Sequence, residues 1–321
     1  MIDSKRIRPL RLRKTEALLR RISDTNPKYD RVEEKLKIRA SGYRGEQSLD
    51  YYVSFLDKKK YQILHGLRLQ DAANDHYFEI DTLIITPSLI IPIDAKNHKG
   101  ELHFDEQFDQ LIQTYEGQKT SYDSPLAQIT RHEFQLKSLL QLYKFPTVPI
   151  EPLVVITNPS TIVTASQNHK QIHKIIKSLS LITKIGNIEK RFKVEVFDHK
   201  QIQKLTKLLL KLNTPYDNSI LEEFDLHEDD ILKGVHCPKC GTLPMKRLPR
   251  KWECTSCGHS DKDAHIAAIE DYVLLFGNTI TNQKLREFLN LPSRSAATRI
   301  LKSLNFQFTG ENKGRIYKIS I

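Results

Sequence analysis

Two acidic residues and a lysine border apolar segments in a pattern that suits metal-assisted hydrolysis. Asp94 and Lys96 are two residues apart in LIIPIDAK, so a strand would place both side chains on one face. Asp81 lies in the preceding apolar segment FEIDTLII, and it would lie beside Asp94 if the two segments pair as a hairpin through the turn at Pro87. Buried charges are costly unless they are paired or bind a cation. Mg²⁺ is held by one or two carboxylates together with waters and phosphate oxygens.

Glu46 adds a third acid, at the start of the segment RGEQSLDYYVSFL. The spacing of Leu49, Val53 and Leu56 predicts an amphipathic helix that could bring Glu46 to the same place. A bound Mg²⁺ would stabilise charge on phosphate oxygens and lower the pKa of a water, and Lys96 would position that water or offset the charge. An ordinary solvated strand is the alternative, because Asp-x-Lys is common on surfaces. The adjoining apolar runs favour a buried site.

Two Cys-x-x-Cys pairs are separated by thirteen residues, and a glycine follows each pair. With this spacing, the two thiolates of one tight turn reach one tetrahedral Zn²⁺, and two such turns make a closed site of four ligands. A redox pair or free thiols are the alternatives, but a redox motif needs only one pair. The sequence therefore predicts a zinc ribbon with structural Zn²⁺. Its four predicted ligands are Cys237, Cys240, Cys254 and Cys257.

Basic residues gather in two C-terminal segments. Between the cysteine pairs, MKRLPRKWEC predicts a basic strand pair whose aromatic residue would stack on a base, with a solvated hairpin as the alternative. Further on, a helix, two helices around a turn and a glycine-containing hairpin follow in the order of a winged helix-turn-helix, with a small helical packing domain as the alternative. The candidate nucleic-acid contacts are Lys246, Arg247, Arg250, Lys251 and Trp252, then Arg294, Arg299, Lys302, Lys313 and Arg315.

Length and composition allow two or three domains. The 321 residues are 39% hydrophobic, which is enough for a substantial core. Fifty Lys and Arg residues against 39 Asp and Glu residues give a net charge of +11, which favours a polyanionic partner such as nucleic acid. No apolar run approaches the roughly 20 residues that cross a bilayer, and the N-terminus lacks the apolar core of a signal peptide. The sequence predicts a soluble, cytoplasmic protein that uses its cysteines as metal ligands.

The pattern of apolar residues predicts an α/β fold with a mixed sheet flanked by helices. Strands are expected at YQILHGLRL, YFEIDTLIIT, LIIPIDAK, FDQLIQTYEG and EPLVVIT, and a helix at PLAQITRHEFQLKSLLQLY. Within 167–212, FKVEVF is strand-like and QIQKLTKLLLKL is helix-like. The predicted organisation is a basic helical extension at 1–40, the α/β domain at 41–212, an acidic linker at 213–232, the zinc ribbon at 233–262 and the winged helix-turn-helix at 263–321.

Across these motifs the chain resembles the nuclease-related domain family, NERD, of the PD-(D/E)xK restriction-endonuclease-like superfamily. The resemblance runs from about Gly42 to Thr157, through GYRGEQSLDYYVSFL, EIDTLIITPSLIIPIDAKNHKGEL and SPLAQITRHEFQLKSLL. It implies a restriction-endonuclease-like mixed sheet and a nuclease that depends on Mg²⁺ or Mn²⁺, with DNA as the expected substrate. The family usually has glutamate at the position of Asp94, although the superfamily accepts either acid. Pro92 removes a ladder donor, which predicts a bulge or an edge strand.

Residue by residue, the resemblance implies that Asp81 and Asp94 bind the metal and that Lys96 is the catalytic lysine. Glu46 corresponds to the acid of the first helix, and Gln128 to a glutamine of the later helix that orients substrate or a metal ligand. Two functions stay open: a metal-dependent endonuclease or exonuclease, and a non-cleaving nucleic-acid-binding or regulatory protein built on the same fold. The intact set of two acids and a lysine favours the nuclease.

Overall fold

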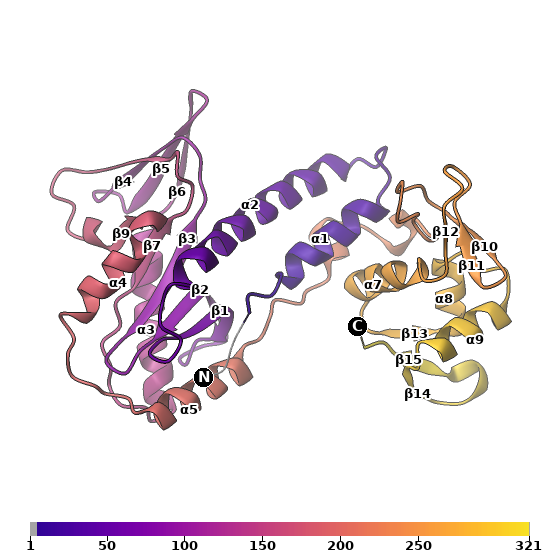
Figure 1. Cartoon of the computed structure of the whole chain (residues 1–321). Helices are drawn as coiled ribbons and strands as arrows, with labels where there is room; N and C mark the ends of the chain where they lie inside the picture. Colours follow the sequence, from indigo (N-terminus) through magenta and orange to yellow (C-terminus); the bar gives the residue numbers. More distant parts are fainter. Residues whose placement is uncertain (1–4, 321) are drawn as a thin grey trace. The chain divides into compact units, whose positions relative to one another are not determined.

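The computed structural model describes residues 5–320, except for the side chain of Lys313. Within this range the chain divides into two units, whose elements are labelled in Figure 1. Unit 1 comprises residues 5–9 and Ile38–Tyr216, and unit 2 comprises Leu10–Lys37 and residues 217–320. The N-terminal segment 5–9 therefore belongs to a different unit from the helix that follows it. No helix in the described range is long and apolar enough to span a bilayer.

The main sheet of unit 1 has five strands in the order β1-β2-β3-β7-β9. The first three strands pair antiparallel, whereas β3, β7 and β9 pair parallel, so the sheet is mixed. The predicted α/β class is confirmed. The strands are β1 (Gln62–Gln70), β2 (Tyr77–Ile85), β3 (Ile90–Lys96), β7 (Leu153–Ile156) and β9 (Ile175–Lys177).

A second sheet of unit 1 has the order β6-β5-β4-β8. Its strands β4, β5 and β6 form an antiparallel meander, and β8 pairs parallel with β4. Leu102, Phe104 and Leu111 from this sheet share a buried cluster with Leu126 and Ile129. The strands are β4 (Glu101–Asp105), β5 (Gln110–Tyr115), β6 (Gln118–Asp123) and β8 (Ile162–Ala165).

Helices cover both faces of the main sheet. Leu83 and Ile85 of β2 pack in one buried cluster and Ile84 packs in another, and because successive strand residues point to opposite faces, the clusters lie on opposite faces. Side chains of α3 and α5 join the first cluster, and side chains of α2 and α4 join the second. The helices are α2 (Tyr29–Val53), α3 (Pro125–Leu142), α4 (Leu181–Glu189) and α5 (His199–Leu212), with short 3₁₀ turns η1 (Ile172–Lys174) and η2 (Ser178–Ser180).

Two local predictions for unit 1 are wrong. The strand-like segment FKVEVF, residues 192–197, forms no strand, and the amides of Val196 and Phe197 instead both donate to the carbonyl of Pro87. Pro92 lies in a central strand rather than at an edge. It is tolerated because the parallel pairing of β3 is interrupted there: Ile90 bridges Ile150, and the continuous β3–β7 ladder begins only at Ile93, so the missing amide falls in the gap.

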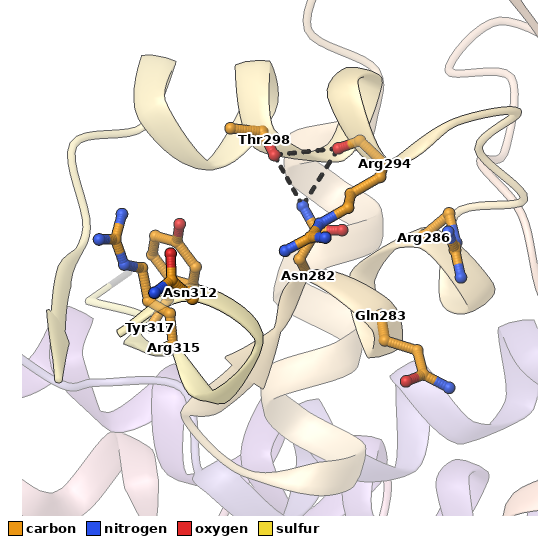
Figure 2. Close-up of a pocket in the computed structure, with 8 residues that line it drawn as sticks. All are labelled: Asn282, Gln283, Arg286, Arg294, Thr298, Asn312, Arg315 and Tyr317. Atoms are coloured by element: carbon orange, nitrogen blue, oxygen red, sulfur yellow. Dashed lines mark hydrogen bonds between the residues drawn. The ribbon is translucent and has the colours of Figure 1, made fainter. Parts of the chain in front are cut away.

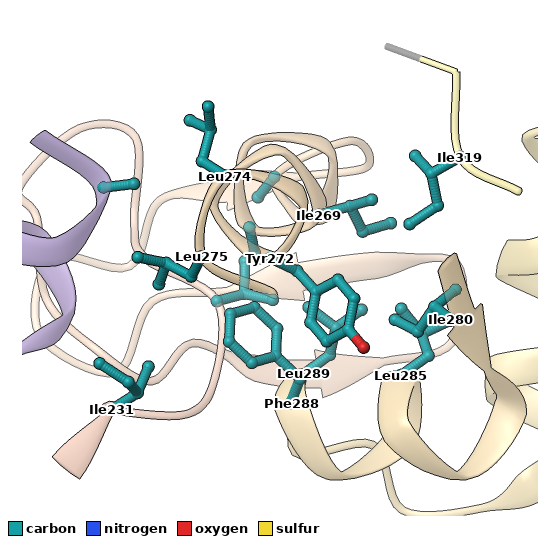
Figure 3. Close-up of a cluster of buried hydrophobic side chains, with 14 of the residues drawn as sticks. Ile231, Ile269, Tyr272, Leu274, Leu275, Ile280, Leu285, Phe288, Leu289 and Ile319 are labelled. Carbon is teal, nitrogen blue, oxygen red and sulfur yellow. The ribbon is translucent and has the colours of Figure 1, made fainter. Parts of the chain in front are cut away.

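In unit 2, helices α1 (Leu10–Arg21), α6 (Ile220–Glu223) and α7 (His265–Phe276) contribute to one large buried cluster, part of which is drawn in Figure 3. Gly277 ends α7 with a φ of +94°, as its position in the sequence predicts. The cysteine-bearing segment contains a small antiparallel sheet. Its strands are β10 (Lys246–Leu248), β11 (Lys251–Glu253) and β12 (Ser260–Asp261), and a 3₁₀ turn, η3 (Glu228–Asp230), precedes them.

The C-terminal part of unit 2 contains two helices and three short strands. The strands form an antiparallel sheet in the order β13-β15-β14. Helices α8 and α9 follow β13, and the β14–β15 hairpin follows α9, which is the order of elements that the sequence predicts. The elements are β13 (Thr279–Thr281), α8 (Asn282–Phe288), α9 (Arg294–Ser303), β14 (Gln307–Thr309), η4 (Asn312–Gly314) and β15 (Ile316–Lys318).

Candidate functional site

The β2–β3 hairpin places Asp81 beside Asp94. The antiparallel register pairs Thr82 with Ile93, so the two acids occupy the next position along the strands. The Oδ2 atom of Asp81 accepts a hydrogen bond of 2.7 Å from the amide of Ala95, and Asp94 is 7% exposed. The predicted hairpin through Pro87 is confirmed, and it brings two carboxylates together at the end of a buried strand.

Lys96 lies on the same face of β3 as Asp94 and contacts it directly. Its Nζ atom lies 2.8 Å from Oδ2 of Asp94 and donates to Oδ1 at 3.1 Å. The same Nζ atom donates to Oε1 of Gln128 at 3.1 Å. Ser124 caps α3, with Pro125 in its first turn, so Gln128 lies near the start of the helix. The structure thus brings three of the predicted residues into direct contact.

Gly45 allows α2 to approach the strands closely. A Cβ atom at this position would lie 2.6 Å from Cβ of Asn97 and 2.8 Å from Oγ1 of Thr157, so a larger residue would push the helix away. Glu46 therefore follows a residue at which the backbone of α2 lies close to the side chains of Asn97 and Thr157. The sequence predicts that Glu46 reaches the two aspartates. In the structure, however, Glu46 forms an ion pair with a residue that no sequence motif singles out.

That residue is Arg6, whose side chain is 3% exposed. Its Nη1 atom donates to Oε2 of Glu46 and to the carbonyl of Asp81, both at 3.0 Å. Its Nη2 atom donates to Oγ1 of Thr82 at 2.8 Å, and its Nε atom donates to Oδ1 of Asp50 at 3.0 Å. Arg6 lies outside the family resemblance and in no periodic pattern, so the sequence carries no signal for this contact.

The acids of the site resist ionisation. Burial raises the pKa of Glu46 to about 8; the charge of Asp81 adds to this effect and Arg6 opposes it. Burial also raises the pKa of Asp81 to about 6, with a further contribution from Asp94. The pKa of Asp94 is raised by burial as well, against the opposing charge of Lys96. The protein's own cations therefore do not fully offset the negative charge of the three carboxylates.

The donor atoms fit a hard divalent cation held by two carboxylates. Oδ2 of Asp94 is buried and has no hydrogen-bond partner among the described residues, although Nζ of Lys96 lies beside it. Asp81 lies next to it across the hairpin, and Mg²⁺ needs only one or two carboxylates because it keeps several waters. Among the described residues, no group of three acids is gathered closely enough to hold a metal. Glu46 is therefore not placed as a third ligand.

The raised pKa of Glu46 predicts a pH-dependent stability. Because the pKa is raised from 4.5 to about 8, folded unit 1 keeps a proton that the unfolded chain releases in this window. The contribution of protonated Glu46 to the free energy of unfolding is fully present below pH 4.5. It is lost as the pH rises toward 8, at up to about 1.4 kcal/mol per pH unit. Glu46→Gln removes this titration.

We expect the difference in unfolding free energy, wild type minus Glu46→Gln, to fall with rising pH in magnesium-free buffer. Hydrogen exchange of the β2 and β3 amides reports on unit 1 and measures this difference. Saturating Mg²⁺ should make this difference depend less on pH only if binding of the ion displaces the proton from Glu46. A difference that stays constant from about pH 5 to 8 contradicts the raised pKa.

His132 is a second residue near the site that no sequence motif singles out. It is buried on α3, one helical turn after Gln128. Burial lowers its pKa to about 4, with contributions from Arg131 and Lys96, so the imidazole is neutral at pH 7. The spacing of four residues from Gln128 is the only signal in the sequence that relates the two side chains.

The four cysteines form a second candidate centre, in unit 2. Their Sγ atoms all lie within 4.8 Å of one another, and two cross pairs are separated by 3.7 and 3.5 Å. A tetrahedral Zn²⁺ with Zn–S bonds of about 2.3 Å requires S–S distances of about 3.8 Å, so the cluster fits zinc. Gly241 and Gly258 follow the pairs with φ values of +77° and +69°, which suit glycine. The clustered residues are Cys237, Cys240, Cys254 and Cys257.

We expect one zinc ion for each purified chain. Cys237→Ser or Cys254→Ser should abolish zinc binding and loosen unit 2, because a closed thiolate site contributes directly to folding. The amides of unit 1 should keep their protection from hydrogen exchange in these variants. Elemental analysis of protein purified without chelators measures the zinc. Protein that contains no zinc, or that keeps zinc after both substitutions, rules out the zinc site.

Trp252 does not have the role that the sequence predicts. It is fully buried, its indole donates to Nδ1 of His265 at 3.3 Å, and the guanidinium of Arg247 lies 4.9 Å from its ring centre. A ring in this position has no face available to a base, so its role is to pack the cysteine-bearing module. Lys251 is paired with Glu253 at 2.9 Å. Lys246 and Arg250 are exposed.

The basic residues of α9 lie on its exposed side. Arg294, Arg299 and Lys302 are exposed, whereas Ala297 and Ile300 are buried in the core of unit 2. In the following hairpin, the guanidinium of Arg315 lies 4.0 Å from the ring centre of Phe308, and the side chain of Lys313 lies outside the described residues. The exposed side of α9 is thus basic, and nucleic-acid binding by it stays a prediction.

Comparison with known families agrees with the resemblance seen in the sequence. Residues 41–157 match the family model described as nuclease-related domain, NERD. No match was found among curated proteins or among solved structures. The matched segment includes Glu46, Asp81, Asp94, Lys96 and Gln128. Residues 41–157, about a third of the chain, are therefore similar to the nuclease-related domain family.

Proposed function

We propose that the protein is a metal-dependent nuclease that hydrolyses phosphodiester bonds, with DNA as its substrate. The observation that carries this proposal is the contact of Lys96 with both Asp94 and Gln128, beside Asp81, at the end of a buried strand. A structural ion pair would not need a second carboxylate next to it. The match to a nuclease-related domain supports the same chemistry.

In this proposal Asp81 and Asp94 would hold Mg²⁺ or Mn²⁺. When bound, such an ion stabilises charge on the phosphate oxygens and lowers the pKa of a bound water. Lys96 keeps a positive charge at a fixed position, where it holds the attacking water or offsets the charge that develops on the phosphate. Gln128 accepts a hydrogen bond from Nζ and so orients the ammonium group. Arg6 connects the side chain of Glu46 to the backbone carbonyl of Asp81.

The C-terminal modules would supply binding to nucleic acid. The cysteine cluster would form a zinc ribbon, in which structural Zn²⁺ holds the module together. Helices α8 and α9 and the β14–β15 hairpin would form a winged helix-turn-helix, with α9 presented to DNA. The exposed basic residues of α9 and the positive net charge of the chain support this assignment.

A non-cleaving nucleic-acid-binding protein is the second candidate function. It is favoured by the engagement of Glu46 with Arg6, because this acid is not grouped with Asp81 and Asp94 as a third metal ligand. In that case the basic modules of unit 2 would carry the function, and Asp94 and Lys96 would form a structural ion pair.

Incubation of the purified protein with linear, circular and single-stranded DNA and with RNA separates the two candidates. We expect cleavage with Mg²⁺ or Mn²⁺ and none with EDTA. Cutting of the closed circle identifies an endonuclease, and cutting only of linear substrates identifies an exonuclease. Binding without cleavage under all metal conditions supports the non-cleaving protein instead.

A further inference from the structure

A hollow of about 490 Å³ lies in the C-terminal part of unit 2 (Figure 2). Three arginines from three different parts of the chain line it: Arg286 lies in α8, Arg294 in the first turn of α9, and Arg315 immediately before β15. The described residues that line the hollow include no carboxylate. Three positive charges therefore surround one space without an acid to offset them.

The guanidinium groups around the hollow lack acceptors. Among the described residues, the side chains of Arg286 and Arg294 make no hydrogen bond or ion pair. The Nε atom of Arg315 is buried and has no hydrogen-bond partner in the described part of the chain. A buried donor without an acceptor is unfavourable, so an acceptor that enters the hollow would be stabilised there.

Part of the frame of the hollow is held in place before any ligand binds. The side-chain amide of Asn282 donates to the carbonyl of Arg294 at 3.2 Å and to Oγ1 of Thr298 at 3.0 Å. Oγ1 of Thr298 donates in turn to the same carbonyl at 3.0 Å. These bonds, drawn as dashed lines in Figure 2, connect the start of α8 to the first turn of α9. A ligand would therefore meet a preformed site.

We propose that this hollow binds a phosphate group of a nucleic acid, with Arg286, Arg294 and Arg315 as its donors. Phosphate oxygens accept paired, charge-assisted hydrogen bonds from the planar guanidinium group, which suits this composition. The volume lies within the range of about 300 to 1,000 Å³ typical of ligand pockets, so a phosphate can enter with its sugar. Exposed Arg299 and Lys302 continue the basic side of α9 outside the hollow, which favours a polyanion over a single anion.

The proposal deepens the nucleic-acid role proposed for unit 2 and rests on it. It adds Arg286, which is absent from the contacts predicted from the sequence, because only the folding of α8 against α9 brings it near Arg294. The phosphate can come from an internal phosphodiester or from a chain end. Duplexes with and without a 5′-phosphate separate these two sources.

The test uses the full chain, zinc-bound, in Mg²⁺-free buffer so that binding is measured without cleavage. Fluorescence anisotropy with a short labelled duplex gives the Kd at several salt concentrations. Arg286→Ala should raise the Kd about tenfold and reduce the salt slope by about one. Arg286→Lys should recover the slope but not the full affinity, because it keeps the charge and loses the paired donors.

Lys284→Ala is the matched control, since it removes one charge from the same helix at an exposed position that does not line the hollow. Equal effects of Arg286→Ala and Lys284→Ala, in variants with wild-type thermal stability, overturn the phosphate site while leaving the nuclease proposal intact. A wild-type chain that binds neither DNA nor RNA overturns the phosphate site together with the nucleic-acid role. Metal-dependent cleavage by the wild type is measured separately. It shows whether the nuclease proposal stands when the phosphate site fails.

Discussion

Lys96→Ala is expected to slow metal-dependent cleavage at least about a hundredfold while leaving cation binding intact. The reason is that the proposed site does not use Lys96 as a metal ligand. Its ammonium contacts Asp94 and Gln128, and its removal takes away a positive charge beside the carboxylates without taking away an oxygen donor. The affinity for Mg²⁺ should stay the same or rise. Calorimetric Mg²⁺ titration and single-turnover cleavage measure the two effects separately.

Asp94→Ala should show the complementary defect. It removes one of the two proposed oxygen ligands, so it should weaken Mg²⁺ binding as well as abolish cleavage. Gln128→Ala is a useful third variant, because it frees Nζ of Lys96 from one acceptor without changing the charge of the site. Hydrogen exchange of β3 must first show that each variant is folded. A folded Lys96→Ala protein that cuts at the wild-type rate contradicts the proposed roles.

Arg21→Ala is expected to destabilise unit 2 by about 3 kcal/mol or more. The Arg21 side chain is 0% exposed, and its Nε atom donates to Oδ2 of Asp271 at 2.8 Å. Nη1 also donates to the carbonyls of Leu232 and Gly234, both at 3.1 Å. Removing the guanidinium leaves a buried carboxylate and two carbonyls without this donor. The loss of unfolding free energy should therefore exceed the loss that follows removal of an exposed ion pair.

Arg20→Ala provides the matched control, because Arg20 pairs with the same carboxylate from the same helix but is 50% exposed. We expect this variant to lose about 1 kcal/mol or less. The chain has one tryptophan, Trp252, which is fully buried in unit 2, so its fluorescence during urea unfolding reports on this unit. Equal losses of unfolding free energy in Arg21→Ala and Arg20→Ala would show that the burial of Arg21 does not determine its contribution to the stability of unit 2.

Much of the candidate site follows from local patterns in the sequence. Apolar runs around Asp81 and Asp94 predict buried strands, the turn at Pro87 predicts their pairing, and the period of a strand places Lys96 on the same face as Asp94. Gln128 lies on a helix that the spacing of its apolar residues predicts. These inferences depend on neighbours close in the chain, and the structure brings Asp94, Lys96 and Gln128 into contact.

Features that depend on distant contacts were not predictable in this way. Arg6 reaches Glu46 across forty residues of sequence and belongs to no periodic pattern. Trp252 lies in a basic segment, which predicts an exposed ring, yet packing against His265 and Arg247 buries it. The segment 192–197 has the composition of a strand, but its amides bond to the turn at Pro87 instead of an open sheet edge. In each case tertiary packing decided the outcome over local preference.

Anomalous diffraction from Mn²⁺-soaked crystals of the wild-type chain tests the central claim most directly, because it locates the cation without relying on activity. We expect an anomalous peak for one ion between the carboxylates of Asp81 and Asp94, at the metal–oxygen distances of a hard cation, with Nζ of Lys96 outside the coordination sphere. In a crystal of folded Asp94→Ala protein this peak should be lost. Saturating Mn²⁺ that leaves these carboxylates without a peak, in crystals of protein that cleaves DNA, would contradict the account.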